Sequence, residues 1–244
     1  MFQSVQRQPV SEAVYQQLRR RIVARDLAPG SELPAERVLA EKLGVNRGAV
    51  REAVKRLQQA GLIAVRQGGN HVVLDYETEG GLELLPSLLT DQHGNINPTV
   101  ARSIMGMRSS FAPDIAAAAA KRGGATLADA LDAVLMKMRA CAKDTAALQP
   151  FALEFWQLLV QNCGNIAFRL AFNSMNKTYR NIWGLLTRVL EPEFRDFDNL
   201  QRLVNAVRDG DSELARDCGR KHVEIGRMAL ERVLDAMPKN RTPA

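Results

Sequence analysis

The order of periodic segments between residues 11 and 75 limits the fold of this chain more than any other feature. Residues 11–26 place apolar side chains at helical spacing, and residues 34–44 form a second, shorter helical pattern that ends at a glycine. A third helix is expected over residues 46–61, because Asn46 suits an N-cap and a glycine follows the last helical position. Two of these helices are joined by a tight link, which is typical of a helix-turn-helix.

A glycine-containing turn follows the third helix. In the stretch LIAVRQGGNHVVLD, apolar and polar residues alternate on both sides of residues 67–70. This alternation predicts two strands joined by the turn. A helix-turn-helix followed by such a hairpin is a winged helix.

The third helix carries two stripes of side chains that face different partners. Its apolar stripe consists of Val50, Val54 and Leu57. Its basic stripe, about 90° further round the helix, consists of Arg47, Arg51 and Lys55. A basic stripe alone is more often a solvated surface than a binding site, so its surroundings must decide.

Basic charge is concentrated in the same part of the chain. The net charge is +6, and residues 1–76 hold 12 lysines and arginines against 7 aspartates and glutamates, a net of +5, which leaves +1 for the remainder. Arg37, Arg47 and Arg51 should converge on one surface beside the glycine turn. We therefore predict that this part binds double-stranded DNA, with the third helix in the major groove and the wing near the backbone or the minor groove.

The segment PGSELPAERVLAEKLGVNRGAVREAVKRLQQAGLIAVRQGGNHVV resembles the DNA-binding domain of the GntR family of bacterial transcription regulators, over about residues 9–75. The resemblance implies DNA contacts from Arg37, Asn46, Arg47, Gly48, Arg51, Gln67, Gly68 and Gly69. Their chemistry agrees, because arginine can fork onto guanine or phosphate and glycine lets the backbone approach closely. Simpler interpretations stay open: Arg37 as a surface charge, Gly68 and Gly69 as a hairpin turn, and the neighbouring His71 as an exposed strand residue.

Residues 77–244 follow a helical pattern almost throughout. The expected helices span about 81–90, 98–122, 125–142, 146–163, 166–190, 193–209 and 211–236, with glycines at several joints. We expect a mainly α protein in which a winged-helix domain, residues 1–76, precedes an all-α bundle of about six to seven helices, residues 77–244. The alanine run at residues 116–120 is typical of close helix packing.

The helical segment resembles the effector-binding and dimerisation domain of the FadR-type branch of the GntR family, most clearly in YETEGGLELLPSLL and ALEFWQLLVQNCGN. Many members of this branch hold a divalent metal with one aspartate and three histidines. The corresponding positions here are Ala152, Trp156, Leu200 and His222. One imidazole cannot replace four ligands, so we expect no metal and no other cofactor.

The same replacements make the centre of the bundle apolar, which favours either a filled core or a pocket for an acyl or aromatic group. Fatty-acid-responsive members of the branch also lack the complete metal set, so the resemblance makes an acyl-CoA or another amphipathic effector worth testing. The candidate effector contacts are Arg108, Trp156, Asn173, Tyr179 and His222.

Other protein classes lack support in the sequence. It contains no GxSxG, phosphate-binding loop, dinucleotide fingerprint or HExxH motif of the common enzyme classes. No apolar run approaches a membrane span and no signal peptide is apparent, so we expect a cytoplasmic protein with no membrane partner. The three cysteines are expected to be reduced thiols.

We expect a dimeric, ligand-responsive transcription regulator whose paired winged helices bind the two half-sites of a palindromic operator. The alternative is a constitutive DNA-binding protein with a filled helical core and no effector.

Overall fold

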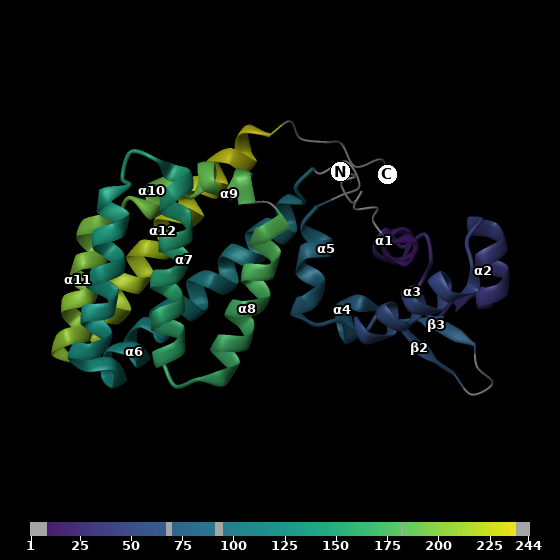
Figure 1. The fold of residues 1–244 in the computed structure, drawn as a ribbon, viewed down its shortest axis with the longest axis horizontal. Coiled ribbons are helices and arrows are strands. Elements are labelled where there is room, and N and C mark those ends of the chain that lie inside the picture. The colour runs from purple at the N-terminus through teal and green to yellow at the C-terminus, as the bar shows by residue number, and fades with distance from the viewer. Residues whose placement is uncertain (1–8, 67–69, 91–94, 182, 238–244) are drawn as a thin grey trace, which may run out of the picture. The chain divides into compact units, whose positions relative to one another are not determined.

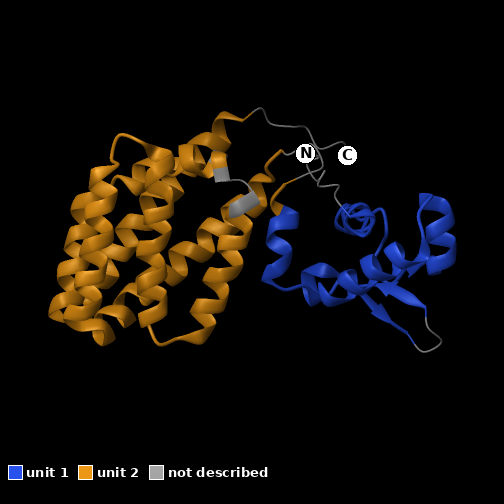
Figure 2. Ribbon diagram, in the orientation of Figure 1, with its two compact units in different colours: residues 1–88, 92–94 blue, residues 89–91, 95–244 orange. Residues whose placement is uncertain are grey.

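The structure, a computed structural model, describes residues 9–66, 70–90, 95–181 and 183–237. The chain divides into two compact units, residues 1–88 with 92–94 and residues 89–91 with 95–244 (Figure 2).

The first unit contains short helices and a small sheet. Its elements are α1 (Val10–Val23), β1 (Glu32–Leu33), α2 (Glu36–Leu43), α3 (Arg47–Gln59), β2 (Ile63–Val65), β3 (His71–Val73), α4 (Tyr76–Glu79), a 3₁₀ turn (Leu82–Leu84) and α5 (Leu85–Leu89), whose last residue belongs to the second unit (Figure 1). The antiparallel sheet has the order β1-β3-β2, and β2 pairs with β3 in the register Ile63 to Val73. The predicted winged helix is confirmed, and β1 adds a strand that the sequence pattern did not reveal.

The helices of the first unit pack through the predicted apolar stripes. The core includes Val14, Leu18 and Ile22 of α1, Val50, Val54 and Leu57 of α3, and Leu62, Ile63, Val73 and Leu84. Each such side chain contributes about 1.5–3 kcal/mol when fully buried. Gly44 ends α2 with φ 65°, a left-handed conformation that glycine adopts without strain, and the chain then turns into α3.

The second unit is entirely helical among its described residues. Its helices are α6 (Pro98–Ala140), α7 (Thr145–Asn162), α8 (Ile166–Asn181), α9 (Trp183–Val189), α10 (Glu191–Phe194), α11 (Phe197–Asp209) and α12 (Ser212–Ala236) (Figure 1). Gly124 interrupts α6 with φ 54° and ψ −157°, where the sequence predicted the joint between two helices. The predicted all-α bundle is confirmed. Within the single helix expected over 166–190 the described residues form α8 and α9, and residue 182 between them lies outside the described residues.

Helices α6 and α12 approach each other closely through small residues. A methyl group on Gly219 of α12 would lie 3.0 Å from the Cβ of Ala116 and 3.1 Å from the carbonyl oxygen of Ala112. Four of the five alanines at 116–120 are buried. The alanine run therefore packs closely, as its composition predicted.

Candidate functional site

The basic stripe of α3 is on the surface of the first unit. Arg47, Arg51 and Lys55 are exposed, whereas the apolar stripe of α3 is buried in the core. The helix starts at Asn46, whose side-chain oxygen accepts a hydrogen bond from the backbone N–H of Ala49 at 2.8 Å. No acidic residue lies in the first turn. The helix dipole at this end therefore keeps its attraction for anions.

Two acidic side chains hold the arginines of this surface. The Nε of Arg51 donates to Glu36 of α2 at 3.1 Å, and an Nη of Arg37 donates to Glu41 at 2.7 Å. Both arginines are well exposed, and exposed ion pairs contribute only about 0–1 kcal/mol. Each guanidinium can therefore exchange its carboxylate for phosphate or guanine at little energetic cost.

Gly48, in the first turn of α3, is exposed beside the Asn46 cap. A methyl group there would lie 3.3 Å from the Asn46 side-chain oxygen, so glycine leaves both the cap and the approach to the backbone open. The predicted wing contacts Gln67, Gly68 and Gly69 lie outside the described residues. Next to that turn, the N–H of Arg66 donates to the carbonyl of Asn70 at 2.8 Å, which closes the hairpin.

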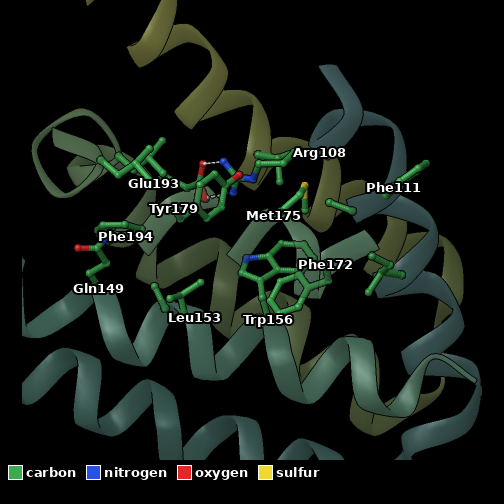
Figure 3. A pocket seen from close by; sticks show the side chains of 16 residues that line it. Arg108, Phe111, Gln149, Leu153, Trp156, Phe172, Met175, Tyr179, Glu193 and Phe194 are labelled. Atoms are coloured by element: carbon green, nitrogen blue, oxygen red, sulfur yellow. Dashed lines mark hydrogen bonds and ion pairs between the residues drawn. The ribbon is translucent and has the colours of Figure 1, made fainter. Parts of the chain in front are cut away.

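The second unit encloses a cavity of about 650 Å³, its open mouth included (Figure 3). Most of the lining is apolar: Phe111, Ala112, Ile115, Ala152, Leu153, Trp156, Phe172, Met175, Leu186, Leu190, Phe194 and Val223. Arg108, Gln149, Tyr179 and Glu193 supply its polar groups. An apolar hollow with a few polar groups is typical of a small-molecule site.

The charged groups of the cavity neutralise each other. Arg108 and Glu193 form a two-armed ion pair, with one Nη of Arg108 3.2 Å from Glu193 Oε2, and their side chains are 10% and 2% exposed. Burial alone would lower the pKa of Arg108, but the Glu193 charge raises it above its usual value. Since the guanidinium already has a carboxylate partner, it offers a ligand no unpaired charge.

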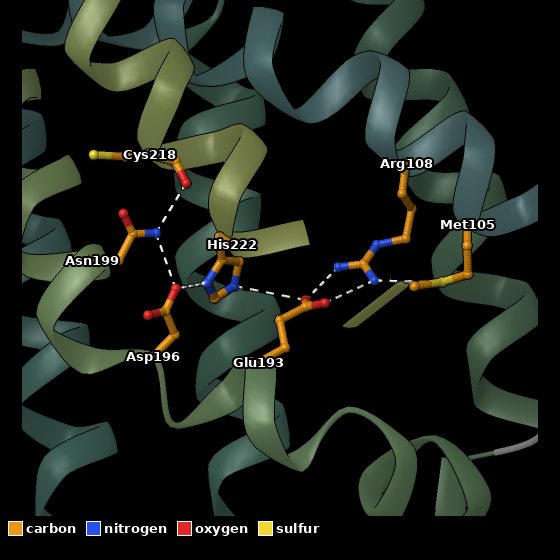
Figure 4. A network of polar contacts seen from close by, with 7 residues as sticks. All are labelled: Met105, Arg108, Glu193, Asp196, Asn199, Cys218 and His222. Atoms are coloured by element: carbon orange, nitrogen blue, oxygen red, sulfur yellow. Dashed lines mark hydrogen bonds and ion pairs between the residues drawn. The ribbon is translucent and has the colours of Figure 1, made fainter. Parts of the chain in front are cut away.

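A buried polar network continues from this ion pair away from the cavity (Figure 4). His222 lies 3.7 Å from Glu193 through Nε2 and 3.1 Å from Asp196 through Nδ1. The Nδ2 of Asn199 donates to Asp196 and to the carbonyl of Cys218, at 3.0 Å each. His222 thus lies between two carboxylates, with Nδ1 at hydrogen-bond distance from Asp196.

Two polar groups at the cavity, unlike the Arg108–Glu193 pair, have no hydrogen-bond partner among the described residues. The indole N–H of Trp156 and the hydroxyl of Tyr179 are buried and have no hydrogen-bond partner among the described residues. Both side chains line the cavity and are 8% exposed (Figure 3). Burial raises the pKa of Tyr179, which keeps its hydroxyl protonated and able to donate. A buried donor without a partner costs about 1–3 kcal/mol, and a ligand acceptor would recover that energy.

The structure brings together three of the five expected effector contacts. Arg108, Trp156 and Tyr179 line the cavity, whereas His222 is outside the lining and packs against Trp156, with tilted rings whose centroids are 5.7 Å apart. Asn173 is exposed and lines a separate surface hollow.

The lining residues that were not expected from the sequence include Phe172, Met175, Glu193 and Phe194. Glu193 had no local signal, because its partner lies 85 residues away along the chain.

The four positions that correspond to metal ligands in the branch have different surroundings. Ala152 and Trp156 line the cavity, while Leu200 is fully buried elsewhere in the core and His222 binds carboxylates. Across residues 9–66, 70–90, 95–181 and 183–237, no group of three or more His, Cys, Asp or Glu side chains could hold a metal ion. None of the helices in those ranges has the length and apolar character that a membrane span requires.

Each of the two units matches the model of a known protein family. Residues 10–73 match the model of the bacterial regulatory proteins of the gntR family, and residues 103–225 match that of the FCD domain. The HTH-type transcriptional regulator Mce2R of Mycobacterium tuberculosis is 35% identical over 96% of both chains. A fatty acid metabolism regulator protein of Haemophilus influenzae is 26% identical over 86% of both chains.

The fold comparison agrees. The solved structure of Lar, which controls the expression of the Listeria monocytogenes agr system, has a TM-score of 0.58, with 17% identity and coverage of 96% of this chain and 99% of that one. These relatives are regulators rather than enzymes. The protein is a transcription regulator that belongs to the FadR-type branch of the GntR family, with an FCD domain in its second unit.

Proposed function

We propose that this protein binds a palindromic operator as a homodimer and that an amphipathic small molecule in the cavity of the second unit changes its affinity for that operator. The lining of the cavity carries the proposal, because its wall is largely apolar and holds two buried hydrogen-bond donors without a partner among the described residues. A filled core, which a constitutive regulator would have, needs neither the space nor the unpaired donors.

The DNA-binding part of the proposal rests on α2 and α3. Arg47 and Arg51 contact base edges in the major groove, and Arg37 contacts phosphate. Asn46 and Gly48 let the backbone at the start of α3 approach the DNA, and Gln67, Gly68 and Gly69 do so at the wing. The exposure of Arg37, Arg47 and Arg51 supports these roles, as do the weak ion pairs that hold two of them.

The effector part follows from the polarity of the cavity. Because Glu193 already neutralises Arg108, a free carboxylate gains no unpaired cation there, whereas an uncharged carbonyl can accept from Trp156 and Tyr179. The apolar wall suits a hydrocarbon chain. A thioester with an acyl chain combines both features, and the relative named as a fatty acid metabolism regulator supports the choice of acyl-CoA as the test ligand.

Calorimetry of the full chain with saturated acyl-CoAs and with the matching free fatty acids tests this effector class. We expect the thioesters to bind more tightly than the acids. Trp156→Phe, which removes the indole N–H and keeps an aromatic ring, should weaken acyl-CoA binding by roughly fivefold, since a hydrogen bond contributes about 1 kcal/mol. Equal binding by the variant, or preference for the free acids, would contradict the assigned contacts.

Selection of bound sequences from a random DNA pool tests the operator. The recovered sites should contain two inverted half-sites about 10 base pairs apart or a multiple of that spacing, because two related winged helices must face the same side of the duplex. Recovery of single, asymmetric sites would contradict the dimeric mode.

A further inference from the structure

The two ion pairs on the exposed surface of α2 and α3 hold their arginines by different nitrogens. Glu36 accepts from the Nε of Arg51 at 3.1 Å, whereas Glu41 accepts from an Nη of Arg37 at 2.7 Å. No hydrogen bond or ion pair with a described residue engages either Nη of Arg51. The end of the Arg51 guanidinium, which carries both Nη groups, is therefore free, while the end of the Arg37 guanidinium is partly occupied.

The free end of Arg51 has the geometry of a base contact. Its two Nη groups can fork onto O6 and N7 of a guanine while the Nε stays bound to Glu36. With α3 in the major groove, base edges form the floor of the groove and phosphates lie along its sides. A turn of Arg51 towards a phosphate changes the direction of the guanidinium, so it releases the Nε from Glu36.

Glu36 is held in place by its position in α2. It is the first residue of that helix, where the helix dipole favours a carboxylate. Leu39 and Ala40 of the same helix are buried in one core with Val50 of α3. The side chain of Glu36 is 26% exposed, against 61% for Glu41. The Glu36 carboxylate is therefore the better fixed of the two relative to the surface of the third helix.

The negative charge of Glu36 acts differently on the two kinds of DNA contact. It opposes an approach of phosphates to Arg51, and attraction to phosphates supplies most of the affinity for DNA of any sequence. It leaves the Nη donors of Arg51 available, and only the correct base accepts from both of them. The carboxylate thus weakens sequence-independent binding more than it weakens binding to the operator.

We infer that Glu36 is a positioning residue that determines specificity: it holds Arg51 by the Nε, directs both Nη groups to a base, and opposes transfer of Arg51 to a phosphate. This inference rests on the proposed base contact of Arg51. Glu41 has no such role, because it occupies an Nη of Arg37 and leaves that arginine without a free forked end.

The test compares the affinities of the full chain and of Glu36→Gln for operator and random DNA, by fluorescence anisotropy. Glutamine has nearly the same size as glutamate and no charge. The ratio of operator affinity to random-DNA affinity should fall about three- to fivefold, in line with the strength of an exposed ion pair, mainly because random DNA binds more tightly. The salt dependence on random DNA should steepen by about one phosphate contact, and that on the operator should stay the same.

Glu41→Gln is the matched control, because it removes the same charge from an exposed ion pair on the same helix. It should raise the affinity for both DNAs by the same factor and leave their ratio unchanged. A second control introduces Glu36→Gln into the Arg51→Ala variant. There the ratio should no longer respond, because no guanidinium is left to position. Glu36→Asp, whose shorter side chain draws the carboxylate away from the Nε, should also lower the ratio and replaces Glu36→Gln if thermal unfolding shows that the latter does not fold.

Three results would overturn the inference and leave the DNA-binding proposal intact. They are an unchanged ratio in the folded Glu36 variant, an equal fall of the ratio for Glu41→Gln, and an equal fall in the Arg51→Ala background. If Arg51→Ala alone weakens binding to operator and random DNA equally, Arg51 contacts a phosphate. The proposed base contact then fails, and the inference fails with it.

Discussion

The two arginines that project from α3 are supported differently. Arg51 is anchored by Glu36 on the neighbouring helix, whereas no ion pair with a described residue anchors Arg47 in the structure. Both lie about 90° round α3 from the stripe of Val50 and Val54, which fix the helix in the core. Rigid burial on one face orients the exposed arginines on the other.

Arg47→Ala and Arg51→Ala should each cost about 1–3 kcal/mol in binding to operator DNA, because a bidentate contact to a base discriminates by that amount. Random DNA should lose less affinity. Anisotropy titrations on both DNAs provide the measurement, with Arg21→Ala, an exposed arginine of α1, as the charge-matched control. Equal losses on the two DNAs would assign the arginines to phosphate contacts instead.

For single residues, the sequence predicted the placement of side chains where that placement follows from local periodicity. The basic stripe of α3 is an example, since a period of 3.6 residues places it about 90° round the helix from the apolar stripe. The resemblance to a known branch supplied Arg108, Trp156 and Tyr179. Glu193 could not be predicted, because its burial beside Arg108 depends on how α10 packs against α6.

Helix α12 lies close to the Glu193 side chain of α10 at Gly226. A methyl group on Gly226 would overlap the Oε2 of Glu193 and lie 3.0 Å from a methyl of Leu190. The carboxylate cannot simply turn away, because it is 2% exposed and paired with Arg108. The glycine thus leaves room for the buried ion pair.

Gly226→Ala should lower the free energy of unfolding by about 1–3 kcal/mol, the usual cost of overfilling a packed site. The matched control is Gly106→Ala in α6, where a methyl group meets nothing within 4 Å. In that helix the same change should raise stability by about 0.5–1 kcal/mol, since alanine favours helix over glycine. Urea unfolding monitored by circular dichroism measures both, and a stabilised Gly226 variant would show that the ion pair is not tightly packed.

Element boundaries were predictable where a glycine adopts a left-handed conformation. Gly124, Gly164 and Gly210 have φ of 54°, 71° and 70° and mark three of the predicted joints. Strand β1 was missed because two residues are too few to show alternation.

For the whole molecule, the boundary at residues 76 and 77 and the homodimer stay predictions. Tyr76 and Leu88 pack against the core of the first unit and Leu84 belongs to it, so that core uses residues beyond the strands of the wing. A fragment that tests the first unit by itself should therefore extend to residue 88.

Light scattering should find the full chain dimeric at micromolar concentration and the fragment of residues 1–88 monomeric. A stable interface buries about 1,200–2,000 Å² in total. A helical bundle has whole helix faces available for such an interface, whereas a winged helix has little free surface. A dimeric fragment would move the interface to the first unit, and a monomeric full chain would contradict the two-half-site mode of binding.

The central claim is that occupation of the cavity in the second unit changes DNA affinity in the first. The most direct measurement is the operator affinity of the full chain, by anisotropy, with and without hexadecanoyl-CoA at a concentration that calorimetry shows to be saturating. The account predicts a change of at least about fivefold, in the range of typical coupling between sites, and no change for the cavity-filling Ala112→Phe variant. An unaltered operator affinity at proven saturation of the unaltered chain would contradict it.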